Sequence, residues 1–106
     1  MSKSEVKEIQ RFLIAVRKLD GDMTIQRLNV LLEVYLTGEI DQSTLVKKAR
    51  LSRSSASKNI ASWTKLNAYK KKAPGFILST PDPMNLKTRV LTLTTKGKAA
   101  VESLFA

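Results

Sequence analysis

The chain has 106 residues, of which 42% are hydrophobic, and a formal net charge of +10, so it can bury one modest core and is too apolar to be disordered. It lacks cysteine and histidine, which excludes disulfides, the usual zinc sites and most nucleophile–base pairs other than a Ser–Lys dyad or a carboxylate pair, and we expect no enzyme and no cofactor. No apolar run could cross a bilayer and no secretory signal opens the chain, so we expect a cytoplasmic location and no membrane partner.

Charge is distributed unevenly along the chain. Residues 1–41 carry six Lys and Arg and seven Asp and Glu, whereas residues 42–106 carry thirteen Lys and Arg and only two Asp and Glu. No acid occurs between Gln42 and Pro81. A positive field confined to one part of a small domain indicates a polyanion partner. A basic surface kept for solubility explains the high pI but not the acid-free stretch, and an anionic membrane would require a larger apolar face.

The first predicted helix covers residues 4–19. Val6, Ile9, Leu13 and Val16 recur at helical spacing and form an apolar stripe, and Gly21 ends the helix. This helix is nearly neutral and separate from the basic part of the chain, so it is a candidate for contact between subunits. Packing against the core of its own domain is the alternative.

Two shorter helices are predicted next. The second helix starts at Thr24 and runs to about residue 36, followed by a brief strand at Ile40 and a third helix that is capped by Asp41 or Ser43. The residues expected to face the core are Ile25, Leu28, Leu31, Leu32 and Tyr35 in the second helix, and Leu45, Val46 and Ala49 in the third.

The helix predicted over residues 52–66 is the most informative stretch. Ser52 can cap it, and Ala56, Ile60 and Trp63 share one face that should be buried, with Trp63 as a core anchor. The opposite face carries hydroxyl groups and lysines without a carboxylate, which the major groove of DNA admits; a solvated surface helix is the alternative. Two short helices joined by a tight turn, the second of them basic, form the helix-turn-helix pattern.

A basic hairpin and a last helix are predicted for the rest of the chain. β-prone segments cover residues 68–73, 76–78 and 88–94, interrupted by Pro74-Gly75 and by a turn at residues 79–83. A basic hairpin directly after a recognition helix is typical of a wing. The last helix is expected over residues 98–105, with Ala99, Val101, Leu104 and Phe105 facing inward.

This order of elements resembles the MarR-type winged helix-turn-helix DNA-binding family, and two segments carry the likeness. Residues 51–58 (LSRSSASK) are similar to the entry into the recognition helix, and residues 82–97 (DPMNLKTRVLTLTTKG) to the wing and the start of the next helix. The resemblance spans residues 24–104 and implies a mainly α fold with a small β wing (α+β). Asn85-Leu86-Lys87 stands where the family has an Asp and paired arginines, so only Lys87 keeps the cationic role.

We therefore predict a single winged helix domain over residues 1–106. It comprises an N-terminal helix as candidate dimerisation element (1–22), a helical core with the helix-turn-helix (23–67), a wing hairpin (68–95) and a C-terminal helix (96–106). The sequence resembles a short form that lacks the family's long C-terminal dimerisation helix, so a homodimer would depend on the first and last helices. For the same reason we predict no small-molecule effector.

The expected DNA contacts fall into three groups. The recognition helix reads bases or nearby phosphates, lysines beside it contact phosphates, and cations of the wing contact the backbone or the minor groove. For each lysine taken alone, a solvated side chain is the alternative. The groups are, in that order, Arg53, Ser54, Ser55, Ser57, Lys58 and Ser62; Lys47, Lys48 and Lys65; and Lys70, Lys71, Lys72, Lys87 and Arg89.

The function expected from these features is sequence-specific binding of double-stranded DNA by a small transcriptional regulator that acts as a homodimer. Two alternatives stay open. One is a replication or architectural protein that binds DNA with weak sequence preference. The other is a winged-helix module that docks another protein.

Overall fold

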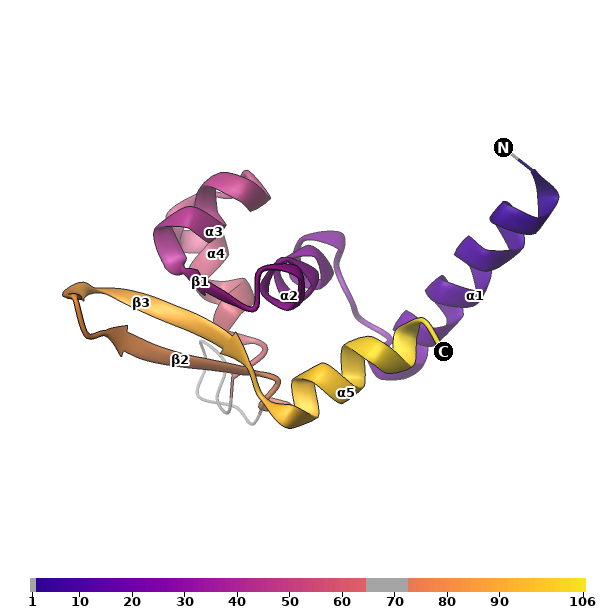
Figure 1. The fold of residues 1–106 in the computed structure, drawn as a ribbon. Helices are drawn as coiled ribbons and strands as arrows, with labels where there is room; N and C mark the ends of the chain where they lie inside the picture. The colour runs from indigo at the N-terminus through magenta and orange to yellow at the C-terminus, as the bar shows by residue number, and fades with distance from the viewer. Residues whose placement is uncertain (1, 65–72) are drawn as a thin grey trace.

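The computed structural model describes residues 2–64 and 73–106, in which helices dominate and a small antiparallel sheet carries a projecting hairpin (Figure 1). This arrangement confirms the predicted mainly α fold with a small β wing. The molecule measures 48 × 28 × 25 Å, with the hairpin at one end and α1 at the other. The elements are α1 (Lys3–Leu19), α2 (Ile25–Thr37), β1 (Glu39–Asp41), α3 (Gln42–Ala49), α4 (Arg53–Ala61), β2 (Ile77–Asp82), β3 (Asn85–Leu93) and α5 (Thr95–Leu104).

Every helix in the described ranges begins at a residue whose side-chain oxygen accepts a hydrogen bond from the backbone N–H three residues later. Such a cap satisfies one of the amide groups that the first turn of a helix leaves free, and it marks the helix start in the sequence. The capping residues are Ser2, Thr24, Asp41, Ser52 and Thr94.

The core lies where α2, α4 and α5 meet the sheet, and Trp63 is at its centre. The Trp63 ring is 1% exposed, and it stacks on Phe76 with 5.5 Å between ring centroids. Its indole N–H donates to the backbone oxygen of Arg27 at 2.7 Å, so its one polar group is satisfied. This confirms Trp63 as a core anchor, together with Ala56 and Ile60 on the same face of α4.

The sheet has the strand order β1-β3-β2, and both pairings are antiparallel. Ile40 pairs with Leu91, which confirms the short strand expected there. The turn predicted at residues 79–83 is wrong for residues 79–82, because these residues continue β2. Pro81 fits there opposite Arg89, since β2 is an edge strand and a proline at an edge removes no ladder hydrogen bond. The segment at 68–73 lies largely outside the described residues.

The N-terminal helix packs differently from an ordinary core helix. It begins at Lys3, one residue earlier than expected, and ends at Leu19 as expected, but Asp20 rather than Gly21 caps its end. Among its stripe residues only Val16 is buried, while Leu13 is 55% exposed and Val6 and Ile9 are also at the surface. The stripe contacts α5 near its end, where Phe12 stacks on Phe105 with 5.1 Å between ring centroids. Most of the apolar face of α1 therefore has no partner within this chain's described residues.

Three other expectations need correction. In α2 the buried residues are Val30, Leu31 and Val34, and Ile25 and Tyr35 are exposed, so the buried face is rotated from the predicted one. The last helix starts at Thr95 rather than at residue 98, because Thr94 caps it, and Ala99 and Phe105 are exposed. The helix predicted over residues 52–66 ends at Ala61.

No helix in the described ranges is long and apolar enough to cross a membrane.

Gly97 should be intolerant of a side chain, although it lies in a helix. A Cβ at this position would lie 2.1 Å from the backbone oxygen of Phe76. We expect Gly97→Ala to lower the free energy of unfolding by about 1–3 kcal/mol, despite alanine's higher helix propensity, because the backbone at Phe76 must move. Urea denaturation followed by circular dichroism measures this. Gly21→Ala is the control, since its Cβ would meet nothing within 4 Å; equal stability of the two variants would contradict the close packing.

Candidate nucleic-acid interface

A tight turn joins α3 to α4 and fixes the angle between them. Arg50 ends α3 in the left-handed conformation (φ 54°, ψ 44°), and the N–H of Leu51 donates to the oxygen of Val46 at 3.2 Å. This closes the last turn of α3, and Ser52 then caps α4 at once by accepting from the N–H of Ser55 at 3.1 Å. Three residues, 50–52, therefore connect one helix to the next, as the helix-turn-helix pattern predicts.

Asp41 anchors the start of α3. Its carboxylate accepts from the N–H of Thr44 at 2.8 Å and from the hydroxyl groups of Ser43 at 2.7 Å and Thr44 at 2.8 Å. The N–H of Thr44 and these two hydroxyl groups hold the pKa of Asp41 below its ordinary value, because all three stabilise the ionised form. The acid thus serves the scaffold, because its carboxylate oxygens bind donors in the first turn of α3.

The outward face of α4 is polar and cationic. Arg53, Ser54, Ser57 and Lys58 are exposed, whereas Ala56 is fully buried on the opposite side. Small hydroxyl side chains keep the helix thin along this face, and the two cations flank them. This is the geometry that the periodicity of the sequence predicts for these four residues.

A shallow groove of about 380 Å³ separates the helix-turn-helix from the wing. None of the described residues that line it is acidic, and its three cations come from α4 and from the wing. Its floor and walls therefore present positive charge and hydroxyl groups together. The lining residues are Gln42, Ser43, Val46, Arg53, Ser57, Lys87, Thr88 and Arg89.

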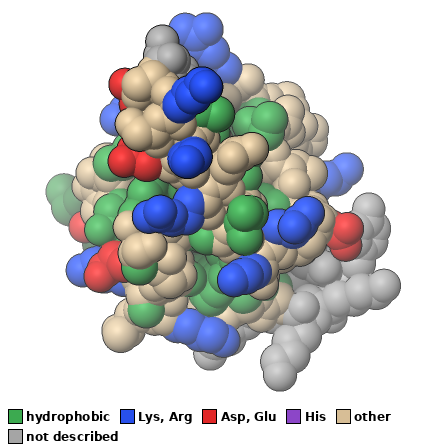
Figure 2. Space-filling view, turned by 90° about the vertical axis from the view of Figure 1, so that its right-hand side faces the viewer, with side chains coloured by type: hydrophobic (Ala, Val, Ile, Leu, Met, Phe, Trp, Pro, Cys, Tyr) green, Lys and Arg blue, Asp and Glu red, His purple; other side chains and the backbone are tan. Residues whose placement is uncertain are grey.

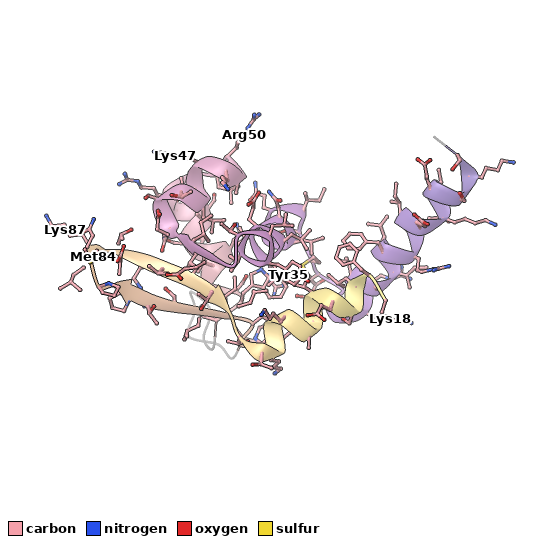
Figure 3. The ribbon with its side chains drawn as sticks, viewed as in Figure 1. Lys18, Tyr35, Lys47, Arg50, Met84 and Lys87 are labelled. Carbon is pink, nitrogen blue, oxygen red and sulfur yellow. The ribbon has the colours of Figure 1, made fainter. Side chains whose placement is uncertain are left out.

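The two cations of the wing, Arg89 and Lys87, differ in their contacts within the chain. The guanidinium of Arg89 crosses the hairpin and donates to the side-chain oxygen of Ser79 at 3.1 Å and to its backbone oxygen at 2.8 Å. Lys87 is exposed near the tip of the hairpin, as Figure 3 shows. The same view shows Lys47 and Arg50 at α3, directed away from the body of the molecule.

Two of the predicted contact residues are partly occupied within the chain. Ser55 is half-buried, and Ser62 donates to the oxygen of Asn59 at 2.6 Å while its hydroxyl accepts from Arg27 Nε at 2.8 Å. Ser62 also lies after the end of α4, so it does not extend the exposed face formed by Ser54, Ser57 and Lys58. Lys65, Lys70, Lys71 and Lys72 lie outside the described residues, whereas Lys47 and Lys48 are exposed in the last turn of α3.

Gln42 belongs to the groove although sequence reasoning missed it. Its side-chain nitrogen donates to the hydroxyl oxygen of Ser57 at 3.2 Å and so links the start of α3 to the exposed face of α4. The two residues are 15 positions apart, and no local pattern signals such a pair. For Ser43, beside Gln42, the sequence predicts only a capping role.

Arg27 connects the end of α1 to the end of α4. Its guanidinium lies 3.9 Å from the centroid of the Trp63 ring, forms an ion pair with Asp20 and donates to the backbone oxygen of Ser62 at 3.3 Å. Partial burial raises the pKa of Asp20, but the N–H of Asp22 and the Arg27 guanidinium lower it further, and the net pKa is below the ordinary value. The pair is ionised at neutral pH and holds the α1–α2 connection against the helix-turn-helix.

No group of three or more His, Cys, Asp or Glu side chains is placed to hold a metal ion in the described ranges.

Neither a protein-family model nor a curated protein matches the sequence, but solved structures resemble its fold. RV1404 from Mycobacterium tuberculosis superposes with a TM-score of 0.72 at 16% identity, over 95% of this chain and 64% of that one. A probable transcriptional regulator from Pseudomonas aeruginosa gives 0.68 at 18% identity, over 92% and 69%. A mutant of MarR from E. coli complexed with operator DNA gives 0.70 at 19% identity, over 94% and 64%.

These likenesses show the fold and confirm the predicted MarR-type winged helix. The chain spans less than two thirds of the length of RV1404 and of MarR.

Asp41 contributes a pH-dependent part of the free energy of unfolding of the domain. We expect Asp41→Ala to lower the free energy of unfolding by about 1 kcal/mol at pH 7, because α3 loses its cap. Since the folded-state pKa is depressed, the contribution of the ionised group is complete above about pH 4 and is lost as the pH falls through the folded-state pKa.

Urea denaturation of both proteins at pH 7 and pH 3 tests this expectation. The difference in free energy of unfolding between the wild type and Asp41→Ala should be smaller at pH 3 than at pH 7. At pH 7 the stability of Asp41→Asn should lie between those of the two proteins, because its amide oxygen can still accept from Thr44. An equal gap at both pH values would contradict the assignment.

Proposed function

We propose that this chain, which has the MarR-type winged helix fold, is a sequence-specific double-stranded DNA-binding transcriptional regulator that acts as a homodimer. The observation that carries the proposal is the groove between α3, α4 and the wing, whose described lining residues include three cations and no acid. There, hydroxyl groups on a thin helix face lie between exposed cations. A duplex offers phosphates to the cations and base edges to the hydroxyl groups.

The proposed docking places α4 in the major groove. Ser54, Ser57 and Lys58 would reach base edges or the phosphates beside them, and Arg53 would lie at the groove between α4 and the wing. Gln42 supports this arrangement, because its bond to Ser57 orients that hydroxyl. Lys47 and Lys48 in the last turn of α3 would contact the backbone, with Lys87 at the wing.

The proposed homodimer uses the exposed apolar face of α1. Figure 2 views the molecule from the side that carries α1 and shows hydrophobic side chains at the surface between Lys and Arg side chains. A single-chain soluble protein seldom leaves such a row of aliphatic side chains in water, and a second copy could cover it. The large hydrophobic residues that are exposed near this end of the molecule are Val6, Ile9, Leu13, Ile14 and Phe105.

Sequence-specific and architectural binding can be separated by selecting duplexes from a random pool. A specific regulator should enrich a defined site, and a dimer with two-fold symmetry should enrich a palindromic one whose half-sites lie about one helical turn apart. A protein with weak sequence preference should enrich nothing and should lose affinity steeply as salt is raised.

Removal of the polar face of α4 should weaken specific binding. We expect Ser54→Ala, Ser57→Ala and Lys58→Ala combined to weaken binding to a selected duplex about 100-fold, because base and phosphate contacts are lost together. Fluorescence anisotropy measures the affinity, and circular dichroism checks the fold, which should be unchanged since all three side chains are exposed. Replacement of Glu33 by alanine on α2 is the control, and unchanged binding by the triple variant would contradict the proposed docking.

A charge in the apolar face of α1 should dissociate the dimer. We expect the wild-type chain to sediment as a dimer at micromolar concentration and Leu13→Glu to sediment as a monomer, because the new carboxylate would be buried without a partner. Ile25→Glu is the matched control, since this side chain is also exposed but lies at the start of α2. A monomeric wild-type chain would contradict the homodimer.

A further inference from the structure

The tip of the wing carries two large hydrophobic side chains that lie almost wholly in water. Met84 is 91% exposed and Leu86 is 79% exposed, and both lie at the end of the hairpin farthest from the core. Figure 3 shows Met84 at this tip, next to Lys87. Neither side chain contributes to the core, so its apolar character serves no folding purpose that the described residues reveal.

Two hydrogen bonds from the backbone to side chains close the turn at the tip. The side chain of Asp82 accepts from the N–H of Met84 at 2.9 Å, and that of Asn85 accepts from the N–H of Lys87 at 3.2 Å. Pro83 restricts the backbone immediately before Met84. These bonds restrict the backbone that carries the two apolar side chains, which lowers the backbone entropy lost when the tip enters a binding site.

The surroundings of the tip indicate what it meets. Lys87 and Arg89, on the same strand, line the cationic groove together with Arg53. The only acid of the hairpin's described residues, Asp82, is engaged by the N–H of Met84. An apolar tip continuous with a cationic groove suits an anionic partner that also has an apolar interior, and stacked base pairs between phosphates have both properties.

The reach of the hairpin is consistent with such a partner. Leu91 of β3 is fully buried under the helices, and Leu86 lies five residues farther along the strand, which corresponds to about 16 Å. One turn of B-DNA is about 34 Å, so half a turn, which separates a major groove from the neighbouring minor groove, is about 17 Å. A hairpin of this length can extend from a helix in the major groove to the next minor groove.

We propose that Met84 and Leu86 form an apolar wedge that enters the minor groove, partly unstacks one base step and bends the duplex. Proteins that bend DNA from the minor groove insert Met, Leu or Pro side chains in this way, and the cost of unstacking is offset by the added contact. Lys87 then neutralises a phosphate beside the wedge. This inference rests on the proposed binding of α4 to duplex DNA.

The wedge predicts a bend that depends on the two apolar side chains. The probe is a duplex of about 30 base pairs and mixed sequence with a donor and an acceptor dye at its ends. Wild-type protein should raise energy transfer between the dyes on binding. The variant Met84→Ser with Leu86→Ser should bind about tenfold more weakly and leave energy transfer near that of free DNA.

Salt dependence separates the wedge from a phosphate contact. The slope of log affinity against log salt should be unchanged in the serine double variant, because no charge is removed. Lys87→Ala should lower the slope by about one for each protomer bound. A double variant with a lowered slope would contradict the wedge.

Ile25→Ser with Leu36→Ser is the matched control. These residues are 88% and 78% exposed, close to the values of the tip residues, and they lie on α2. The control should bind and bend the duplex like the wild type. An equal loss of affinity and energy transfer in both double variants would overturn the wedge. A bend that survives without Met84 and Leu86 would also overturn it. A change in sedimentation confined to the tip variant, with DNA binding intact, would identify the tip as a protein contact and also overturn it. If the wild type bound no duplex at low salt, the proposed function itself would fail.

Discussion

The hydrogen bond from the Trp63 indole to the backbone of Arg27 is the contact on which the arrangement of this molecule depends. It fixes the residues that follow α4 to α2 inside the core. The backbone oxygen of Trp63 in turn accepts from the N–H groups of Phe76, at 2.7 Å, and Ile77, at 3.0 Å, so the first residues of the wing strand start from the same point. One buried residue therefore sets both the direction of α4 and the origin of the hairpin.

The chain separates its scaffold from its candidate contact surface by residue type. Apolar groups and the acids Asp20 and Asp41 hold helices in place, and each acid is engaged by neighbouring donors. The face of α4 and the groove beside it carry hydroxyl groups and cations without a carboxylate among their described lining residues. The cations of the groove therefore have no carboxylate beside them among the described lining residues.

Features that depend on neighbours in the sequence could be predicted, and features that depend on distant partners could not. The caps at Asp41 and Ser52 and the burial of Trp63 follow from local pattern, and the structure confirms them. An amphipathic stripe does not tell which body it faces, so the exposure of Leu13 could not be read from spacing. The link from Gln42 to Ser57 and the contact of Arg27 with Trp63 join residues 15 and 36 positions apart and leave no periodic trace. The roles in DNA contact stay predictions.

The edge position of β2 has a consequence for behaviour at high concentration. A hairpin that protrudes from a small domain offers open backbone groups to which strands of other molecules could add, leading to aggregation. Pro81 interrupts the row of donors along β2, and at the opposite edge β1 is only three residues long. Neither edge is a good template for sheet growth, so the wing can project into solvent without making the protein prone to polymerise.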